Sequence, residues 1–375
     1  DGSSIVIGNF RGTATFGNTT LTSAGGSDVF VAKISADGEY QWATKAGGTG
    51  DDYGPGVSVL ADGSSIVIGT FRGNATFGNF TLTSAGNEDI FVAKLDPNGD
   101  YQWARRAGGV DGEYGYGVSV LADGSSIVTG NFKRTGTFGD IELTSAGGFD
   151  VFVAKLDASG TYKWAKQAGG PSSFDVGRDI SVLPDGSSIV TGRFQGTATF
   201  GSTTLTSAGS DDVFVAKLDA GGSYKWAAKA GGTGVDFGLG VSVLADGSSI
   251  VTGKFQGAAT FGNTTFTSAG NEDVFIAKLD ADGDYQWATT AGGTGADQGS
   301  DLSVLADGSV IVSGAFKGTA HFGNTTLTST GNDDVFVAKL DTNGNYEWAT
   351  RAGGTGADKG FGVSVLADGS SIVTG

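Results

Sequence analysis

Three aspartates alternate within a short stretch of the chain, and their spacing suggests a metal site. Asp280, Asp282 and Asp284 stand in "LDADGDYQW". Calcium takes about six to eight oxygen ligands, and the familiar calcium loop places its glycine after a third acidic position. Here Gly283 directly follows the second aspartate. The spacing therefore favours a tight turn that carries no metal.

Six copies of this stretch within the chain decide between the turn and the metal site. They read SADGE, DPNGD, DASGT, DAGGS, DADGD and DTNGN, so the supposed ligands become serine, threonine, glycine or asparagine. Only one glycine is constant, at Gly38, Gly99, Gly160, Gly222, Gly283 and Gly344. A hairpin turn needs a residue that tolerates positive φ, and glycine does so at no steric cost. We predict hairpin turns at these positions.

The only histidine, His321, is a second candidate for chemistry, as a base or a metal ligand. The other copies carry threonine at its position, at Thr15, Thr76, Thr137, Thr199 and Thr260. The chain has no cysteine, and it has no other histidine that would assist. We predict an ordinary strand position for His321 and no catalytic residue.

A column of carboxylates follows "AGG" in the connection between successive copies. Its members are Asp52, Glu113, Asp175, Asp236, Asp297 and Asp358. In one interpretation each carboxylate is a cap that accepts backbone N–H bonds and fixes the turn. In the other, the six gather around a channel and hold a cation or a polar ligand. The sequence favours the cap and keeps these six residues as candidate ligand-binding positions.

Paired charges also recur, in the motif "DVFVAK". The pairs are Asp28 with Lys33, Asp89 with Lys94, Asp150 with Lys155, Asp212 with Lys217, Asp273 with Lys278 and Asp334 with Lys339. They would mark a binding surface or, as we favour, satisfy polar groups within or between sheets, because a charge that flanks an apolar strand needs a partner.

Aromatic residues recur once per copy in three columns. They are Phe30, Phe91, Phe152, Phe214, Phe275 and Phe336; Trp42, Trp103, Trp164, Trp226, Trp287 and Trp348; and Phe16, Phe77, Phe138, Phe200, Phe261 and Phe322. Periodic tryptophans can stack on sugars. Large rings at matched positions also fill the space between adjacent sheets, and we favour this core role.

The elements that position these residues belong to an internal repeat of 61 residues, with one unit of 62. Repeats begin at residues 1, 62, 123, 185, 246 and 307, and residues 368–375 begin a seventh. Within residues 62–122, two apolar runs are joined by Asp62 and Gly63, and two more by Asn98 and Gly99. Such turns predict four antiparallel strands, with a short extra hairpin around Gly78. No segment has helical periodicity.

Four-stranded repeats of this kind predict an all-β fold, a β-propeller of six four-stranded blades in a single domain over residues 1–375. Runs such as "IFVA" are apolar at consecutive positions, which suits sheets that are covered on both faces by neighbouring blades. The carboxylate column would then ring one mouth of the central channel. Consecutive hairpins alternate between the ends of a blade, so the long connections and the extra hairpins should emerge on the same side.

Three motifs of the repeat resemble the bacterial β-propeller repeat called SBBP, and the resemblance covers every repeat. The motifs are "GVSVLADGSSIVIGTF", "DVFVAKLDADGDYQW" and "AGGTGADQG". It implies a propeller in large secreted or surface proteins, and it supplies no catalytic residues.

Ring closure is predicted from the phase of the repeat. The chain starts without the innermost strand of its first blade, and the equivalent strand, 362–368, lies at the other end. We predict that it pairs beside Ser3 to Gly8 and closes the ring, because an open propeller leaves a strand edge in water. The alternative is that residues 369–375 start a further blade of a longer array.

Composition excludes several classes of function. The net charge is −17 and no cluster of basic residues offers a path for a phosphate backbone, so we expect no nucleic-acid partner. Without cysteine there is no disulfide, thiol nucleophile or thiolate metal site, and no apolar run is long enough to span a bilayer. The chain opens on "DGSSIVIG" without an initiator methionine, as expected of a segment from a longer protein.

The sequence therefore predicts a non-enzymatic, extracellular or cell-surface propeller module, structural or adhesive, within a larger bacterial protein. Its partners would be a protein or a glycan at a surface, with self-association in a tandem array, and it would need no cofactor. The alternative is a glycan-binding propeller lectin with repeated sites on the long-loop face. A hydrolase is a third class, which six similar copies disfavour.

Overall fold

The computed structural model describes residues 2–171, 174–366 and 368–375. Asp1, where the first repeat begins, residues 172–173 of the one longer repeat, and residue 367 of the predicted closing strand lie outside the described residues. The chain forms two compact units, Asp1–Ser188 with Asp219–Ser223, and Ile189–Leu218 with Tyr224–Gly375. All of the regular elements in the described part are strands, as predicted.

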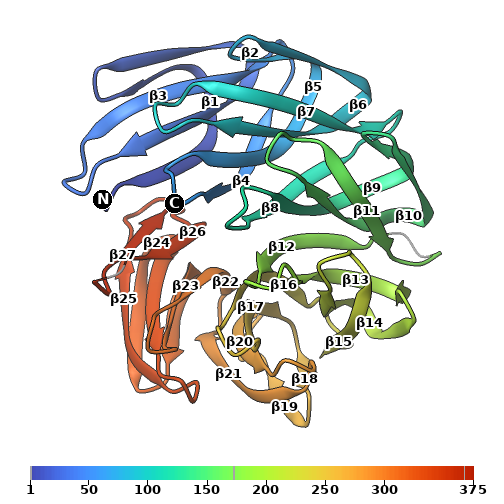
Figure 1. Cartoon of the computed structure of the whole chain (residues 1–375). Helices are drawn as coiled ribbons and strands as arrows, with labels where there is room; N and C mark the ends of the chain where they lie inside the picture. The colour runs from blue at the N-terminus through green and yellow to red at the C-terminus, as the bar shows by residue number, and fades with distance from the viewer. Residues whose placement is uncertain (1, 172–173, 367) are drawn as a thin grey trace. The chain divides into compact units, whose positions relative to one another are not determined.

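The first unit is built from antiparallel sheets with one repeated strand order (Figure 1). Its strands are β1 (Ser4–Phe16), β2 (Thr19–Ile34), β3 (Tyr40–Gly48), β4 (Tyr53–Val59), β5 (Ser65–Phe77), β6 (Phe80–Leu95), β7 (Tyr101–Gly109), β8 (Tyr114–Val120), β9 (Ser126–Phe138), β10 (Ile141–Leu156), β11 (Tyr162–Ala168) and β12 (Val176–Val182). Strands β4 to β7 pair in sequence order, and so do β8 to β11. Each set is the four-stranded unit that the turns predict.

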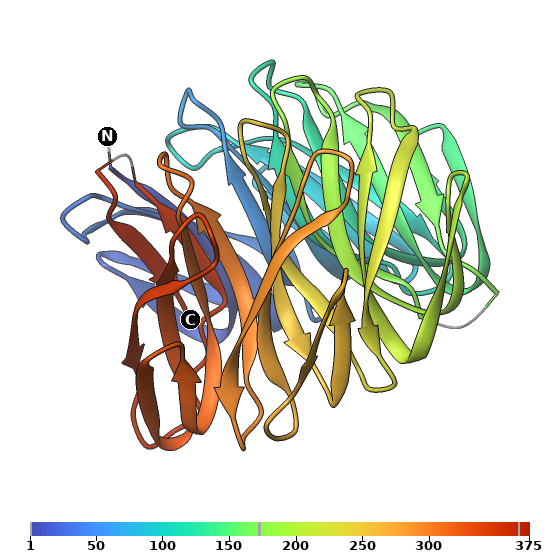
Figure 2. The ribbon, with the colours of Figure 1, turned by 90° about the horizontal axis from the view of Figure 1, so that it is seen from below.

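The second unit repeats this order, and Figure 2 shows its strands running side by side. Its strands are β13 (Ser188–Phe200), β14 (Thr203–Leu218), β15 (Tyr224–Gly232), β16 (Phe237–Val243), β17 (Ser249–Phe255), β18 (Ala258–Phe261), β19 (Thr264–Thr267), β20 (Asp273–Leu279), β21 (Tyr285–Gly293), β22 (Gln298–Val304), β23 (Val310–Phe322), β24 (Thr325–Leu340), β25 (Tyr346–Ala352), β26 (Gly362–Val365) and β27 (Ser371–Thr374). The sets β16, β17, β20, β21 and β22 to β25 are again four-stranded.

The predicted extra hairpin is mostly a continuation of the two middle strands. In the second repeat β5 and β6 run unbroken into it, with a register shift between Arg72 and Asn74. Gly73, which has φ +75°, lies within this shift and lets the strand bend. Only in the fifth repeat is the hairpin separate, as β18 and β19. In the second, third, fifth and sixth repeats the first strand of the hairpin also pairs with the last strand of the preceding repeat, for example Gly47 with Thr76.

The Asp-Gly connections are tight turns in which glycine alone takes the positive φ. The Leu60 N–H donates to Ser64 O, the Gly63 N–H donates to Leu60 O, and Gly63 has φ +83°. The Asp62 carboxylate accepts bonds from the Ser64 N–H and hydroxyl. This side-chain bond explains why aspartate precedes glycine here.

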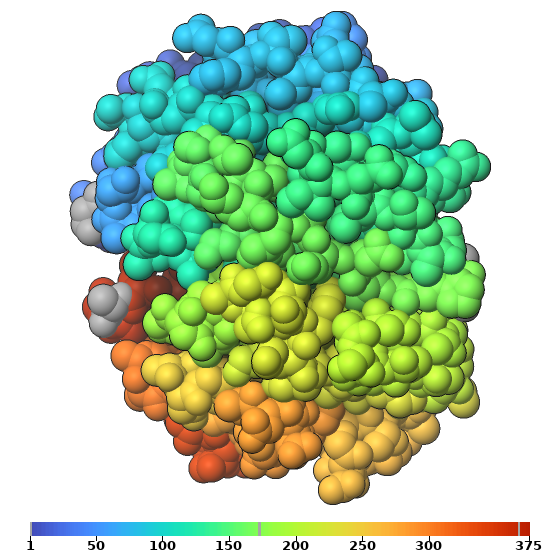
Figure 3. Space-filling model, turned by 45° about the vertical axis from the view of Figure 1, so that its right-hand side comes forward, coloured from blue at the N-terminus to red at the C-terminus, as the bar shows by residue number. Residues whose placement is uncertain are grey.

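Phenylalanines fill the core of each sheet, as predicted for the aromatic columns. Phe77 and Phe91 lie 4.8 Å apart between ring centroids, and Phe71 meets Phe77 edge to face. All three rings are fully buried, in a cluster of side chains from the first and second repeats. The second and third repeats form adjoining bands of surface in Figure 3. Burial on both faces explains the consecutive apolar residues of these strands.

The C-terminal strand takes a different partner from the one predicted. β26 pairs with β27, with Val363 opposite Val373 and Val365 opposite Ser371, in a two-stranded sheet. The predicted closing pair with Ser3 to Gly8 is therefore wrong for the described residues. A short Asp-Gly turn joins β26 to β27, so their pairing closes a much shorter loop and costs less chain entropy.

Candidate functional site

The acidic turn at residues 280–284 is held by its own first aspartate. The Asp280 carboxylate accepts the N–H groups of Asp282 and Asp284, each at 3.0 Å, and the side-chain amide of Gln286 at 2.7 Å. Asp96, Asp157, Asp219 and Asp341 hold their turns with the same oxygen. The carboxylate that suggested calcium is therefore occupied by turn hydrogen bonds.

In the first five repeats the tryptophan bonds to the turn of the next repeat, whereas Trp348 of the sixth is exposed. Trp103 is 7% exposed, and its indole N–H donates to Ala158 O at 3.2 Å. A Cβ atom placed on Gly160, which has φ +80°, would lie 2.8 Å from the Trp103 ring. Trp42, Trp164, Trp226 and Trp287 make the same hydrogen bond. The constant glycine of the turn therefore meets two needs, positive φ and room for the ring.

The carboxylate column also joins successive repeats, by accepting backbone N–H groups from both. Asp297 is fully buried, and its two oxygens accept from Gly293 at 2.7 Å and from Lys317 at 2.9 Å. Asp52 and Asp236 accept from the equivalent residues. Glu113 and Asp175 are fully buried too. These are the capping hydrogen bonds that the sequence favoured.

Four members of this column, Asp52, Glu113, Asp236 and Asp297, have a second carboxylate beside them, a pairing that the sequence did not predict. A Cβ atom built on Gly292 would lie 2.8 Å from both Asp273 Oδ1 and Asp297 Oδ2. Gly47, Gly108 and Gly231 lie between the equivalent carboxylates in their own repeats. One oxygen of the "DVFVAK" aspartate is buried without a hydrogen-bond partner at Asp28, Asp89, Asp150, Asp212, Asp273 and Asp334. Two acidic side chains of the repeat thus lie close together and buried from solvent.

Burial raises the pKa values of four carboxylates of the column and of Asp273 beside one of them. Desolvation raises the pKa of Asp52, Asp236 and Asp297 to about 6, and that of Glu113 to about 7. Bonds from backbone N–H groups oppose the shift, and the neighbouring aspartate adds to it through charge repulsion. Desolvation likewise raises the pKa of Asp273. Protonation of Asp52, Asp236 and Asp297 therefore begins at a higher pH than for free aspartate, and Glu113 titrates close to neutral pH.

The basic side chain that lies beside the "DVFVAK" aspartate differs between repeats. Lys45 lies 3.6 Å from Asp28 and Lys229 lies 3.8 Å from Asp212, while Arg106 lies 3.0 Å from Asp89. Arg351 lies 2.7 Å from Asp334. The third and fifth repeats carry glutamine and threonine at this position. The two charges of "DVFVAK" serve different partners, since Lys339 pairs with Glu347 and not with Asp334.

His321 occupies the strand position that the threonine column predicts. It is exposed, lies opposite Thr326 in the register of β23 and β24, and its Nδ1 is 3.0 Å from the Thr326 hydroxyl. Thr260 and Thr265 make the same cross-strand contact at 2.9 Å.

The outer part of each hairpin displays a threonine face, defined here by Thr13, Thr15, Thr20 and Thr22 and their equivalents. These four side chains are exposed, and the register places Thr13 opposite Thr22 and Thr15 opposite Thr20. The connection loop contacts the base of the hairpin, where the Ser27 N–H donates to Asp51 Oδ1 at 2.8 Å. The long connections and the hairpins therefore emerge on the same side, as predicted.

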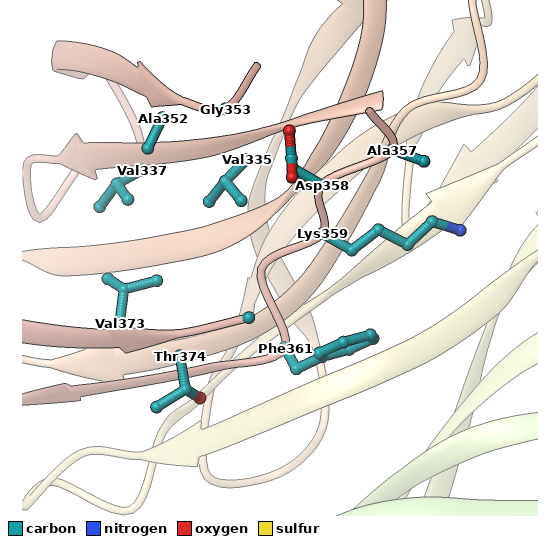
Figure 4. A pocket seen from close by; sticks show the side chains of 11 residues that line it. Val335, Val337, Ala352, Gly353, Ala357, Asp358, Lys359, Phe361, Val373 and Thr374 are labelled. Carbon is teal, nitrogen blue, oxygen red and sulfur yellow. The ribbon is translucent and has the colours of Figure 1, made fainter. Parts of the chain in front are cut away.

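A pocket of about 560 Å³ lies between β24, β27 and the residues that follow β25 (Figure 4). Val335 and Val337 line one side, and Val373, Thr374 and Phe361 line the other. Asp358 is its acidic member, and its carboxylate accepts the Gly354 N–H at 2.7 Å.

Among the residues that the structure describes, no group of three or more histidine, cysteine, aspartate or glutamate side chains is arranged to hold a metal ion. A separate finding concerns membranes: no helix in the described ranges is long and apolar enough to cross one.

Comparison with known proteins gives distant relatives. No family model matches the chain. An uncharacterized WD repeat-containing protein, L264, of Acanthamoeba polyphaga mimivirus is 23% identical over 451 residues, which cover 96% of this chain and 32% of that protein. The regulatory protein FlaEY of Caulobacter vibrioides is 27% identical over 390 residues, which cover 94% of this chain and 39% of that protein. The chain thus spans between 32% and 39% of the length of these relatives.

Among solved structures, the WD40 domain of Pan2 from Neurospora crassa is similar, with a TM-score of 0.51 and 11% sequence identity. The match covers 96% of this chain and 83% of that one. Because the chain is a series of four-stranded antiparallel repeats, this likeness supports one assignment: the fold is all-β and of the β-propeller type.

Proposed function

We propose that the chain is a non-enzymatic β-propeller module with one blade per repeat, which serves a structural or adhesive role in a larger bacterial surface or secreted protein. The extracellular setting rests on the resemblance to the SBBP repeat. One observation carries the non-enzymatic role. The repeated polar and aromatic columns are occupied by contacts within the chain, as at Trp103 with Ala158 O and at Asp297 with Gly293 and Lys317.

The threonine face is the contact surface in this proposal. It is repeated and exposed, and its hydroxyl groups are close enough to bond across the hairpin, as at Thr15 and Thr20, 3.2 Å apart. Hydroxyl groups can hydrogen-bond another surface but lack the pKa for acid-base catalysis at neutral pH. Several modest contacts on one molecule add up through multivalency. A surface module with repeated weak contacts is the function that this arrangement supports best.

Adhesion of beads that carry the purified chain to bacterial cells tests this proposal. The variant Thr13→Lys/Thr204→Lys places two charges on the threonine face, and we expect it to lower bead retention under flow. The control Asn98→Lys/Asn343→Lys adds the same charge at exposed turn positions and should retain wild-type adhesion. Equal retention by all three proteins, with unchanged melting temperatures, would overturn the threonine face as the adhesive surface.

A glycan-binding lectin is the second candidate, and the exposed hydroxyl pairs favour it because they match the chemistry of sugar hydroxyls. The tryptophans give it less support, since Trp103 packs on a turn of the chain itself. A glycan array separates the two candidates. Binding of one sugar class that is lost in Thr260→Ala/Thr265→Ala would establish the lectin, whereas adhesion without glycan binding would favour a protein partner.

A further inference from the structure

The chain contains two Asn-Gly pairs, and both stand in a turn that receives the tryptophan of the preceding repeat. They are Asn98 with Gly99 in the second repeat and Asn343 with Gly344 in the sixth. Asparagine is a chemically labile residue, because the main-chain nitrogen that follows it can attack its side-chain carbonyl carbon. Glycine in the next position has no Cβ to hinder this attack. These two pairs are therefore candidate sites of hydrolytic modification.

Both asparagine side chains are open to water. Asn98 and Asn343 are exposed. The main-chain N–H of each donates to the first aspartate of its turn at 2.9 Å. The turn thus holds the main chain of the asparagine, while its side chain faces the solvent from which a hydrolytic reaction draws water.

The attacking nitrogen, in contrast, is held in place by the folded turn. In the second repeat the Gly99 N–H donates to Asp96 O at 3.0 Å. Trp42 of the first repeat donates its indole N–H to Pro97 O at 3.0 Å, and a Cβ atom built on Gly99 would lie 2.7 Å from the Trp42 ring. The nitrogen can turn toward the Asn98 side chain only after these contacts open, so local opening limits the reaction.

The sixth repeat has the same arrangement around its own pair. The Gly344 N–H donates to Asp341 O at 3.1 Å, and Trp287 of the fifth repeat donates to Thr342 O at 3.2 Å. A Cβ atom on Gly344 would lie 2.6 Å from the Trp287 ring. Each site thus has a tryptophan of its own, and one chain contains two independent tests of the same contact.

The fifth repeat shows what an aspartate does at this position. Asp282 precedes Gly283 there, its N–H donates to Asp280 at 3.0 Å, and the Gly283 N–H donates to Asp280 O at 3.1 Å. Aspartate therefore keeps the turn intact. Isoaspartate differs, because its main chain runs through the side chain and is one atom longer, which displaces the following glycine from the tryptophan.

We propose that Asn98 and Asn343 are sites of hydrolytic deamidation and that the tryptophan of the preceding repeat controls its rate. The nitrogen of Gly99 bonds to Cγ of Asn98 and gives up its proton, the bond from Cγ to the side-chain nitrogen breaks, and ammonia leaves. Water then opens the resulting cyclic imide at either carbonyl group, to give aspartate or isoaspartate. Each event adds one negative charge, and the isoaspartate product releases the tryptophan from the turn.

Peptide mapping by mass spectrometry after incubation of the chain at pH 8.5 tests the proposal, because it measures the deamidated fraction at each site separately. In Trp42→Ala we expect Asn98 to react about five- to tenfold faster than in the wild type, as when opening costs one hydrogen bond less. Asn343 should keep its wild-type rate and serves as the control within the same molecule. Trp287→Ala should show the opposite pattern.

A second variant covers the case in which Trp42→Ala unfolds as a whole, which equal acceleration at both sites would reveal. Trp42→Phe keeps a ring against Gly99 and removes only the indole N–H, and it should still accelerate the reaction at Asn98 alone. Equal rates at Asn98 in the wild type, Trp42→Phe and Trp42→Ala would overturn control by the tryptophan. Absence of reaction at both asparagines in the urea-unfolded chain would overturn the two sites.

The effect of the products is measured by thermal unfolding. Asn98→Asp/Asn343→Asp should melt at the wild-type temperature, because aspartate fits the turn of the fifth repeat. Wild-type chain that has accumulated isoaspartate should melt at a lower temperature. A melting temperature that isoaspartate leaves unchanged would overturn the release of the tryptophan.

Discussion

The second and fifth repeats have the same framework and differ in the charges on their last strands. β7 of the second repeat carries Arg105 and Arg106, and β21 of the fifth carries Thr289 and Thr290. Arg105 donates to Gly160 O and Ser159 O of the following turn, and Arg106 pairs with Asp89. Both repeats nevertheless keep the tryptophan bond to the next turn and the buried acid pair. The packing and backbone contacts therefore define the blade, and the arginines modify it locally.

The largest expected effect comes from removing the tryptophan contact. Trp103→Ala should cost about 3–5 kcal/mol of unfolding free energy, because a buried indole and its hydrogen bond are lost. Trp287→Ala should cost less, since Trp287 is only half-buried and the repeat equivalent of Arg105, which lies over the Trp103 ring, is Thr289. Urea unfolding of the two variants measures the difference. Equal, small losses would show that the tryptophans do not fasten the repeats.

The buried acids predict that stability falls as pH rises. In the folded chain the pKa is about 7 for Glu113 and about 6 for Asp297, both above the values of free side chains. Their stabilising protonation is fully present below the unfolded pKa, near 4, and is lost as pH rises through 6 to 7. We expect each group to account for about 1–3 kcal/mol. Melting temperatures from pH 5 to pH 8 measure this trend.

Glu113→Gln is the control for this pH dependence, because it removes one titrating group and keeps a hydrogen-bond acceptor. The variant should show a flatter profile than the wild type. A melting temperature that rises from pH 5 to pH 8 in the wild type would contradict the assignment.

Arg106→Thr converts the second repeat to the charge arrangement of the fifth. We expect a loss of about 1–3 kcal/mol at pH 8, because Asp89 then stays buried without its cation. Arg106 lowers the pKa of Asp89 while burial raises it, so the loss should shrink as the solution is acidified and Asp89 takes up a proton. Chemical unfolding at pH 8 and pH 5 measures both values. A loss that does not depend on pH would assign the effect to packing of the arginine stem.

The sequence was sufficient for the parts of the blade that depend on local patterns. Alternating apolar runs and the glycines at Gly63 and Gly99 predicted the strands and turns, because a turn with positive φ is decided by a few adjacent residues. The carboxylate cap at Asp297 was predicted for the same reason. The extra hairpin around Gly78 was predicted, but its continuity with the two middle strands was not, since a bulge near Gly73 extends a strand without changing its polarity pattern.

Contacts between strands that are distant in the sequence were beyond this kind of inference. Trp103 and Ala158 are 55 residues apart, and the residues around Trp103 do not indicate which carbonyl group accepts its indole N–H. The partner of the "DVFVAK" aspartate lies on another strand and changes from lysine to arginine, glutamine and threonine between repeats. A column that varies this much gives no periodic signal, although its variation is what distinguishes the fifth repeat from the second.

Asp297→Ala tests whether Asp297 of the carboxylate column is a turn cap or a ligand-binding residue. If Asp297 is a cap, the variant should lose about 0.5–2 kcal/mol of stability, because the N–H groups of Gly293 and Lys317 lose their acceptor. The loss should be smaller at pH 8 than at pH 5, since removal of one charge also relieves repulsion with Asp273. Thermal unfolding at both pH values measures it. Unchanged stability with loss of a bound ligand would favour the ligand site.

The smallest effect is expected at His321, where the sixth repeat departs from the threonine found in both the second and the fifth. Its ring contacts only the Thr326 hydroxyl among the hydrogen bonds described for it, and the side chain is exposed. Thr260 and Thr265 show that two hydroxyl groups make the same cross-strand contact. His321→Thr should therefore change the unfolding free energy by less than about 0.5 kcal/mol, as for other exposed substitutions. Adhesion to bacterial cells should also be unchanged. A large loss of adhesion with unchanged stability would show that the sixth repeat has a contact that the second and fifth lack.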